Sequence, residues 1–153
     1  GESMLEKDVV SLFEKICNQD KKCEFIHKES SPNPTDPHMD VEFIYDGMYI
    51  RAEAKHVNDD PRRQSQSALS LFGSILKGRN LSIADPMKSK NKKIVYALVL
   101  YDDNAAKYRA NYQKIHQQDW KKFGRAFEVN YVFLTSNTEI KVVEWNEFIS
   151  VGV

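Results

Sequence analysis

The stretch that decides the fold runs from His38 to His56 and reads HMDVEFIYDGMYIRAEAKH. Two short runs of alternating polar and apolar residues flank Asp46-Gly47, and Asp-Gly is a strong signal for a two-residue hairpin turn. The turn also sets which residues face one another across the hairpin. The predicted pairs are Tyr45 with Met48, Phe43 with Ile50, Glu42 with Arg51, Val41 with Ala52, and Asp40 with Glu53.

This register gives the hairpin one apolar face and one charged face. The apolar face carries Phe43, Ile50, Ala52 and Ala54, and the charged face carries Asp40, Glu42, Arg51, Glu53 and Lys55. Glu42 opposite Arg51 is a favourable pair, whereas like charges opposite one another, roughly 4.5–5.5 Å apart at Cβ, are destabilising. The Asp40–Glu53 pair therefore calls for a cation, either Lys55 or a divalent metal ion. The alternative is a solvated face with dispersed counter-ions.

The remaining chain reads as alternating helices and strands. Apolar residues at helical spacing predict helices over 4–18, 61–77 and 104–123. Short apolar runs predict strands over 23–27, 94–101, 129–134 and 139–144. Segments 28–37 and 85–93 are predicted to be loops. The order α-β-β-β-α-β-α-β-β favours one α/β domain over 1–153, with a mixed central sheet flanked by helices. Residues 1–3, before Met4, are expected to be an expression remnant.

Asp40, followed thirteen residues later by Glu53-Ala54-Lys55, resembles the motif of the PD-(D/E)xK nuclease superfamily. That resemblance implies a restriction-endonuclease-like αβββαβ core over residues 4 to about 101, with an extra C-terminal helix and strands. The proline of the family motif is not adjacent to the aspartate, since Pro37 lies three residues before it.

The resemblance implies a metal-dependent endonuclease, an enzyme that hydrolyses phosphodiester bonds, with DNA favoured as the substrate. Asp40, Glu53 and the backbone carbonyl of Ala54 would bind one or two Mg²⁺ or Mn²⁺ ions. Lys55 would orient or help to deprotonate the attacking water. Without metal, Lys55 is expected to form an ion pair with Asp40 or Glu53.

Members of this superfamily often carry a further metal-binding Glu on the first helix. Glu6 is the favoured candidate for this role and Glu14 is the second, while a solvated helix charge is the alternative for either. His38 lies just before Asp40 and could approach the site. His56 alternates to the opposite face of its strand, where packing or capping is the simpler role.

Basic and polar residues near the motif predict a polyanionic partner, DNA rather than RNA. The candidates for nucleic-acid binding are Arg62, Arg63, Gln66, Lys77 and Arg79 around the second helix, and Lys88 and Lys90 in the loop 85–93. Such contacts to phosphate supply affinity with little sequence information. A solvated charge run is the alternative interpretation of the loop.

The composition of the chain limits the classes of protein to which it can belong. The 22 basic and 22 acidic residues cancel, so net charge alone does not indicate a nucleic-acid binder. No apolar run approaches the roughly 20 residues of a membrane span, and no signal peptide is visible. Cys17 and Cys23 fit no zinc pattern; they are expected to be reduced thiols of a cytoplasmic protein, with a disulfide as the alternative.

Two other functions stay open. One is a catalytically inactive nucleic-acid-binding or protein-interaction module of the same fold. The other is an RNA-directed endonuclease of the cap-snatching type. A homodimer, and a place within a larger multidomain protein, are both compatible with the sequence.

Overall fold

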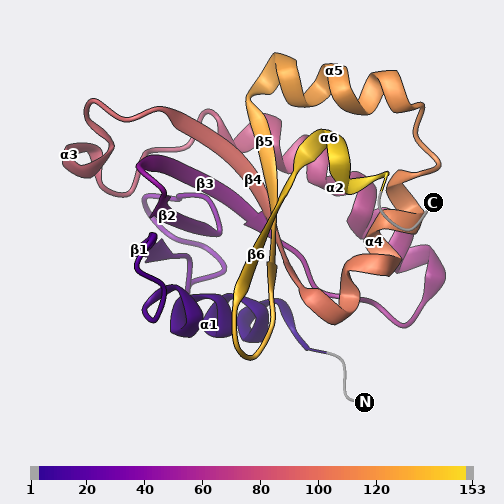
Figure 1. Cartoon of the computed structure of the whole chain (residues 1–153), viewed down its shortest axis with the longest axis horizontal. Coiled ribbons are helices and arrows are strands. Elements are labelled where there is room, and N and C mark those ends of the chain that lie inside the picture. The colour runs from indigo at the N-terminus through magenta and orange to yellow at the C-terminus, as the bar shows by residue number, and fades with distance from the viewer. Residues whose placement is uncertain (1–3, 151–153) are drawn as a thin grey trace.

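The computed structural model describes residues 4–150, so the predicted remnant at 1–3 lies outside the described residues. This part of the chain is an α/β protein with a six-stranded mixed sheet and six helices (Figure 1). The strands are β1 (Cys23–Lys28), β2 (Val41–Tyr45), β3 (Met48–Ala54), β4 (Ile94–Tyr101), β5 (Val129–Thr135) and β6 (Ile140–Glu144). The helices are α1 (Glu6–Cys17), α2 (Pro61–Gly78), α3 (Pro86–Ser89), α4 (Ala105–Tyr112), α5 (Gln117–Phe127) and α6 (Trp145–Phe148).

The strands lie in the sheet in the order in which they occur in the sequence, β1-β2-β3-β4-β5-β6. The pairs β3–β4 and β4–β5 are parallel, and the other three pairs are antiparallel. The predicted hairpin register is confirmed from Val41 opposite Ala52 to Tyr45 opposite Met48. Asp46 (φ 48°) and Gly47 (φ 82°) both have positive φ, as the predicted turn requires.

Helices cover both faces of the sheet and give two hydrophobic cores. On one face α1 packs its buried residues against the apolar side of the hairpin, with Phe13 4.5 Å from Phe43 between ring centroids. On the other face α2, α4, α5 and α6 enclose a larger core rich in aromatic residues. Figure 1 shows α1 below the sheet and α5 above it. The charged face of the hairpin therefore lies under helices rather than in solvent.

The C-terminal part differs from the prediction in its helices. The predicted helix 104–123 is a 3₁₀ turn (Asp102–Asn104) followed by α4 and α5. The break occurs because His116 has a non-helical backbone (φ −55°, ψ 129°) and accepts the Gln118 N–H at its ring Nδ1 (3.3 Å), which begins a new helix. The predicted loop 85–93 contains the short α3, since the Asp85 side chain accepts the Lys88 N–H (3.0 Å) ahead of Pro86.

Cys17 and Cys23 form a disulfide, so the expectation of two reduced thiols is wrong. The reason is geometric. Cys17 ends α1 and Cys23 begins β1, and the turn between them brings their Cα atoms to 5.2 Å, well within bridging range. Nothing among the helices of residues 4–150 is both long and apolar enough to cross a membrane.

Candidate active site

Asp40 and Glu53 meet where the β2–β3 hairpin stops being regular. Backbone pairing ends at Val41 opposite Ala52. Just beyond this pair, the Ala54 N–H donates to Asp40 Oδ2 (3.0 Å). A side-chain carboxylate thus takes the place of a backbone acceptor, which fixes the Asp40 side chain against the end of β3.

A pocket of about 590 Å³ lies over these two carboxyl groups. The connection 29–39 between β1 and β2 forms one wall, and Ser74 and Lys77 of α2 line the other. Glu6, in the first turn of α1, also lines it. Glu14 lies elsewhere on the same helix and is ion-paired with Lys28 (2.8 Å). The structure therefore brings Glu6, and not Glu14, to the pocket.

The carboxyl groups of the pocket share a crowded, dehydrated space. Burial and then the Asp40 charge raise the pKa of Glu53 to about 8, against the opposing effect of Lys55. Burial also raises the pKa of Asp40, although hydrogen bonds from Ala54 and Glu53 act in the other direction. Burial and the charge of Asp40 raise the pKa of Glu6 to about 7. At neutral pH the metal-free site therefore retains protons that solvated carboxyl groups would release.

In the metal-free site, a proton relieves the repulsion between the Asp40 and Glu53 carboxyl groups. Burial raises the pKa of both carboxyl groups, and a hydrogen bond between the two side chains lets the pair share a proton. A divalent cation would relieve the same repulsion, and carboxylate oxygens suit Mg²⁺ and Mn²⁺. Among residues 4–150 no three His, Cys, Asp or Glu side chains form a ready-made cage. The donor set nevertheless fits Mg²⁺, which usually keeps several waters and takes only one or two carboxylates.

Lys55 directly follows β3 and is buried. Its ammonium group donates to Ser70 Oγ of α2 (2.7 Å), and Ser70 Oγ in turn donates to the Ser67 carbonyl (2.8 Å). The direct ion pair expected between Lys55 and Asp40 or Glu53 is therefore replaced, within the described residues, by this contact with α2. The Lys55 charge still lowers the pKa of both carboxyl groups.

Glu42 and Arg51 form a separate buried network with a structural role. Arg51 Nε lies 3.7 Å from Glu42 Oε2, and the Tyr49 hydroxyl donates to Glu42 Oε1 (2.7 Å). The Arg51 guanidinium also donates to the carbonyls of Leu81 (2.9 Å) and Ser82 (3.1 Å). The network ties the segment after α2 to the sheet, which holds the second half of α2 over the pocket.

The predicted nucleic-acid contacts divide by position. Lys77 lines the pocket, and Arg62, Arg63 and Gln66 are exposed on the first turns of α2, close after the strand that carries Glu53. Arg79 is used internally, because its guanidinium donates to the Phe127 carbonyl (2.6 Å).

Lys88 and Lys90 lie away from the candidate site. They occupy the segment before β4, which begins opposite Tyr49, whereas Glu53 lies near the other end of β3. Lys88 is ion-paired with Glu24 of β1. The basic loop and the carboxylate pocket are therefore at opposite ends of the parallel strands.

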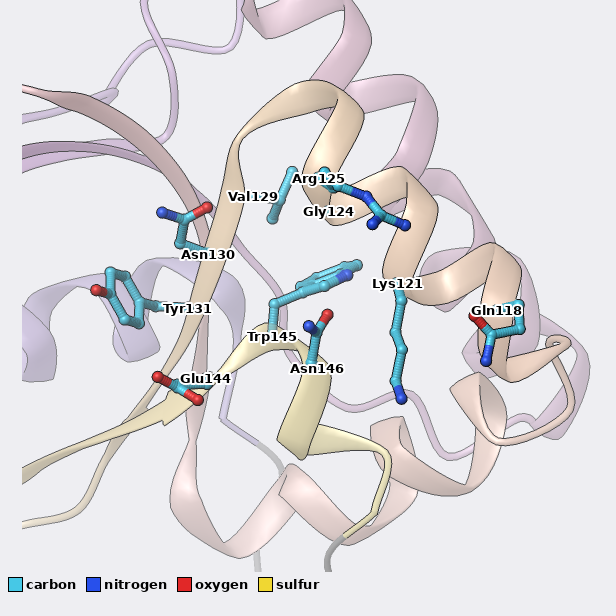
Figure 2. Close-up of a pocket in the computed structure, with 10 residues that line it drawn as sticks. All are labelled: Gln118, Lys121, Gly124, Arg125, Val129, Asn130, Tyr131, Glu144, Trp145 and Asn146. Atoms are coloured by element: carbon cyan, nitrogen blue, oxygen red, sulfur yellow. The ribbon is translucent and has the colours of Figure 1, made fainter.

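A second hollow, of about 450 Å³, lies between α5, β5 and α6 (Figure 2). Figure 2 shows Lys121 and Arg125 extending from α5, with Trp145 between them and the strands. Glu144 is the one acidic side chain that lines it. The residues that line this hollow therefore include no counterpart of the paired, dehydrated carboxyl groups of the first pocket.

No family model matches the chain, and comparison with curated proteins and with solved structures finds no significant match. Sequence reasoning missed Ser70 and Glu29, because neither lies at a spacing that marks it. Both become visible only when α2 and the β1–β2 connection are placed against the hairpin.

Proposed function

We propose that this protein is a Mg²⁺- or Mn²⁺-dependent endonuclease that hydrolyses phosphodiester bonds, with DNA as the favoured substrate. The observation that carries the proposal is the facing pair Asp40 and Glu53, dehydrated at the bottom of a pocket with Lys55 one residue beyond β3. Burying two facing carboxyl groups destabilises a fold, and strongly perturbed carboxyl groups of this kind cluster at functional sites.

The fold supports the same proposal. The sequence of elements α1-β1-β2-β3-α2-β4, with three antiparallel strands followed by a strand parallel to β3, agrees with a restriction-endonuclease-like αβββαβ core. In this assignment β5, β6 and the helices α4 to α6 are additions to the core. The short α3 is an insertion before β4.

Each residue has a defined task in the proposed reaction. Asp40 and Glu53 would hold the cation, with Glu6 beside them and the Ala54 carbonyl available as a further oxygen ligand. A bound divalent ion supplies Lewis acidity at the scissile phosphate and lowers the pKa of a bound water. Lys55, held by Ser70, would orient the attacking water and offset negative charge on the phosphorus.

Contacts outside the carboxylate cluster would guide the substrate. Lys77, on the α2 wall, would meet a phosphate entering the pocket. Arg62 and Arg63 would contact the nucleic-acid backbone beyond it. Neutralising phosphates in this way gives affinity that falls steeply with salt.

The test is cleavage of plasmid DNA, single-stranded DNA and RNA by purified protein with Mg²⁺, Mn²⁺ or EDTA. We expect metal-dependent cleavage that Asp40→Asn and Lys55→Met each lower by on the order of 10²-fold or more. Glu6→Gln should lower it less, because Glu6 would support rather than complete the donor set.

Glu14→Gln provides the matched control on α1, since its carboxylate pairs with Lys28 outside the pocket. It should leave cleavage unchanged. Cleavage that persists in both Asp40→Asn and Lys55→Met would overturn the proposal. Metal-independent nucleic-acid binding without cleavage would favour an inactive binding module, and preferential cleavage of RNA would change the substrate class.

A further inference from the structure

Glu29, which directly follows β1, holds the backbone that carries Asp40. Its own N–H donates to the Asp40 carbonyl (3.0 Å). Its carboxylate Oε2 accepts the His38 N–H (2.8 Å). Glu29 thus binds the chain on both sides of Met39, immediately before the Asp40 side chain enters the pocket.

Both oxygens of the Glu29 carboxylate have a hydrogen-bond partner. Its other oxygen, Oε1, lies 2.8 Å from His27 Nε2, which donates to it. Burial raises the pKa of Glu29, but the hydrogen bonds from His38 and His27 outweigh burial, and the net shift is downward. A carboxylate with both oxygens engaged is better suited to fixing a backbone than to ligating a metal.

A second anchor ties the same segment to the far wall of the pocket. The His38 ring donates from Nδ1 to the Ser82 carbonyl (2.6 Å). The same carbonyl accepts from the buried Arg51. The His27 and His38 rings also meet edge to face, with centroids 4.9 Å apart. Residues 38–40 are therefore held from β1 and from the segment after α2 together.

The rest of the connection offers little support of its own. Residues 30–37 are mostly exposed, form neither helix nor strand, and include three prolines. Without the Glu29 carboxylate, the His38 N–H would lose its acceptor, and residue 38 would be held by its ring and by the neighbouring buried Met39. The Asp40 side chain is short, so its carboxylate follows any movement of its backbone.

We infer that Glu29 is a positioning residue, whose carboxylate keeps the Asp40 side chain facing Glu53 by holding the backbone N–H of His38. For catalysis, this inference rests on the proposed nuclease function. The positioning itself is a property of the protein alone and can be measured without substrate.

The catalytic test compares Glu29→Ala with Glu29→Gln. Displacing a reacting group by about 1 Å can cost on the order of 10²-fold in rate, so we expect Glu29→Ala to lower kcat by roughly 10–100-fold with KM unchanged. Gln retains an oxygen for the His38 N–H and an N–H for the alternative tautomer of His27. Glu29→Gln should therefore recover most of the activity.

Glu24→Ala is the matched control, because it removes an exposed carboxylate from the same strand, where it pairs with Lys88. It should leave kcat unchanged. If Glu29→Ala does not fold, Glu29→Asp carries the same test. It keeps the charge, but its carboxylate is one methylene short of the His38 N–H. Wild-type kcat in both Glu29→Ala and Glu29→Asp would overturn the inference.

The second readout is the backbone amide of Ala54, which donates to Asp40 Oδ2 (3.0 Å). In metal-free protein, Glu29→Ala should shift its NMR resonance and speed its hydrogen exchange by roughly tenfold or more, while Glu29→Gln should not. An unchanged Ala54 amide in Glu29→Ala would refute the positioning role even if wild-type protein cleaves no nucleic acid. Absence of cleavage by the wild type would count against the nuclease proposal alone.

Discussion

At Asp40 and Glu53 two carboxyl groups occupy a space that favours one negative charge. This crowding predicts an unusual dependence of stability on pH in metal-free protein. The pKa of Glu53 is about 8 in the folded state, against an ordinary value of 4.5. Between these values the folded state binds more protons than the unfolded state, so the free energy of unfolding falls as pH rises from about 4.5 to about 8.

Urea denaturation in EDTA at several pH values measures this trend. Glu53→Gln keeps the shape of the side chain and removes its titration. We therefore expect it to reduce the trend, to which Glu6 with its raised pKa also contributes, and to raise the free energy of unfolding at pH 8 by roughly 1–3 kcal/mol. Glu24→Gln, on an exposed carboxylate, should leave the trend unchanged. A wild-type stability that is constant over this interval would contradict the raised pKa.

For individual residues, the sequence predicted positions well where side chains alternate between the two faces of a strand. Asp40 and Glu53 follow from the register of a hairpin with an Asp-Gly turn, one pair beyond Val41 and Ala52, and Lys55 lies two residues after Glu53. Glu29 could not be found in the same way, because its contacts with His38 and Asp40 depend on the path of an irregular, proline-containing connection. Lys55 was identified, but its contact with Ser70 depends on how α2 crosses the sheet.

At the scale of helices and strands, Gly78 allows α2 to lie close to Met39, just before the hairpin. A Cβ at this position would lie 1.9 Å from the Sδ of Met39, the buried residue before Asp40. Gly78→Ala should therefore destabilise the protein by roughly 1–3 kcal/mol.

Gly73 on the same helix is the matched control, since a Cβ there would meet nothing within 4 Å. Gly73→Ala should stabilise the protein by about 0.5–1 kcal/mol through the lower helix propensity of glycine. Thermal unfolding measured for the two variants separates the effects. Equal stability changes in both variants would show that the close packing of Met39 is not what requires glycine at position 78.

Elements were predictable where local chemistry marks their ends. The Asp60-Pro61 start of α2 and the apolar run of β4 agree with the structure, because capping and periodicity act within a few residues. The division of 104–123 into two helices was missed. It depends on His116 capping α5 and on Trp120 stacking with Trp145 at 3.6 Å, a partner 25 residues away along the chain.

For the whole molecule, the Cys17–Cys23 disulfide predicts a stability that depends on redox conditions. Closing so short a loop constrains the unfolded chain by about 2 kcal/mol. Urea denaturation with and without a reductant should show a loss of that size. Cleavage should be unaffected by reduction, because the disulfide lies at the end of α1 opposite to Glu6. Two titratable thiols in protein unfolded without reductant would refute the bridge.

The strand order β1 to β6 has a consequence for how this chain reaches its native state. Each strand joins the outer edge of the strand made just before it, so no strand has to be inserted between two others that have already paired. A nascent chain leaving the ribosome could therefore extend its sheet from one side without undoing earlier contacts. The carboxylate pocket, built from residues before 82, would be assembled before the last two strands are synthesised.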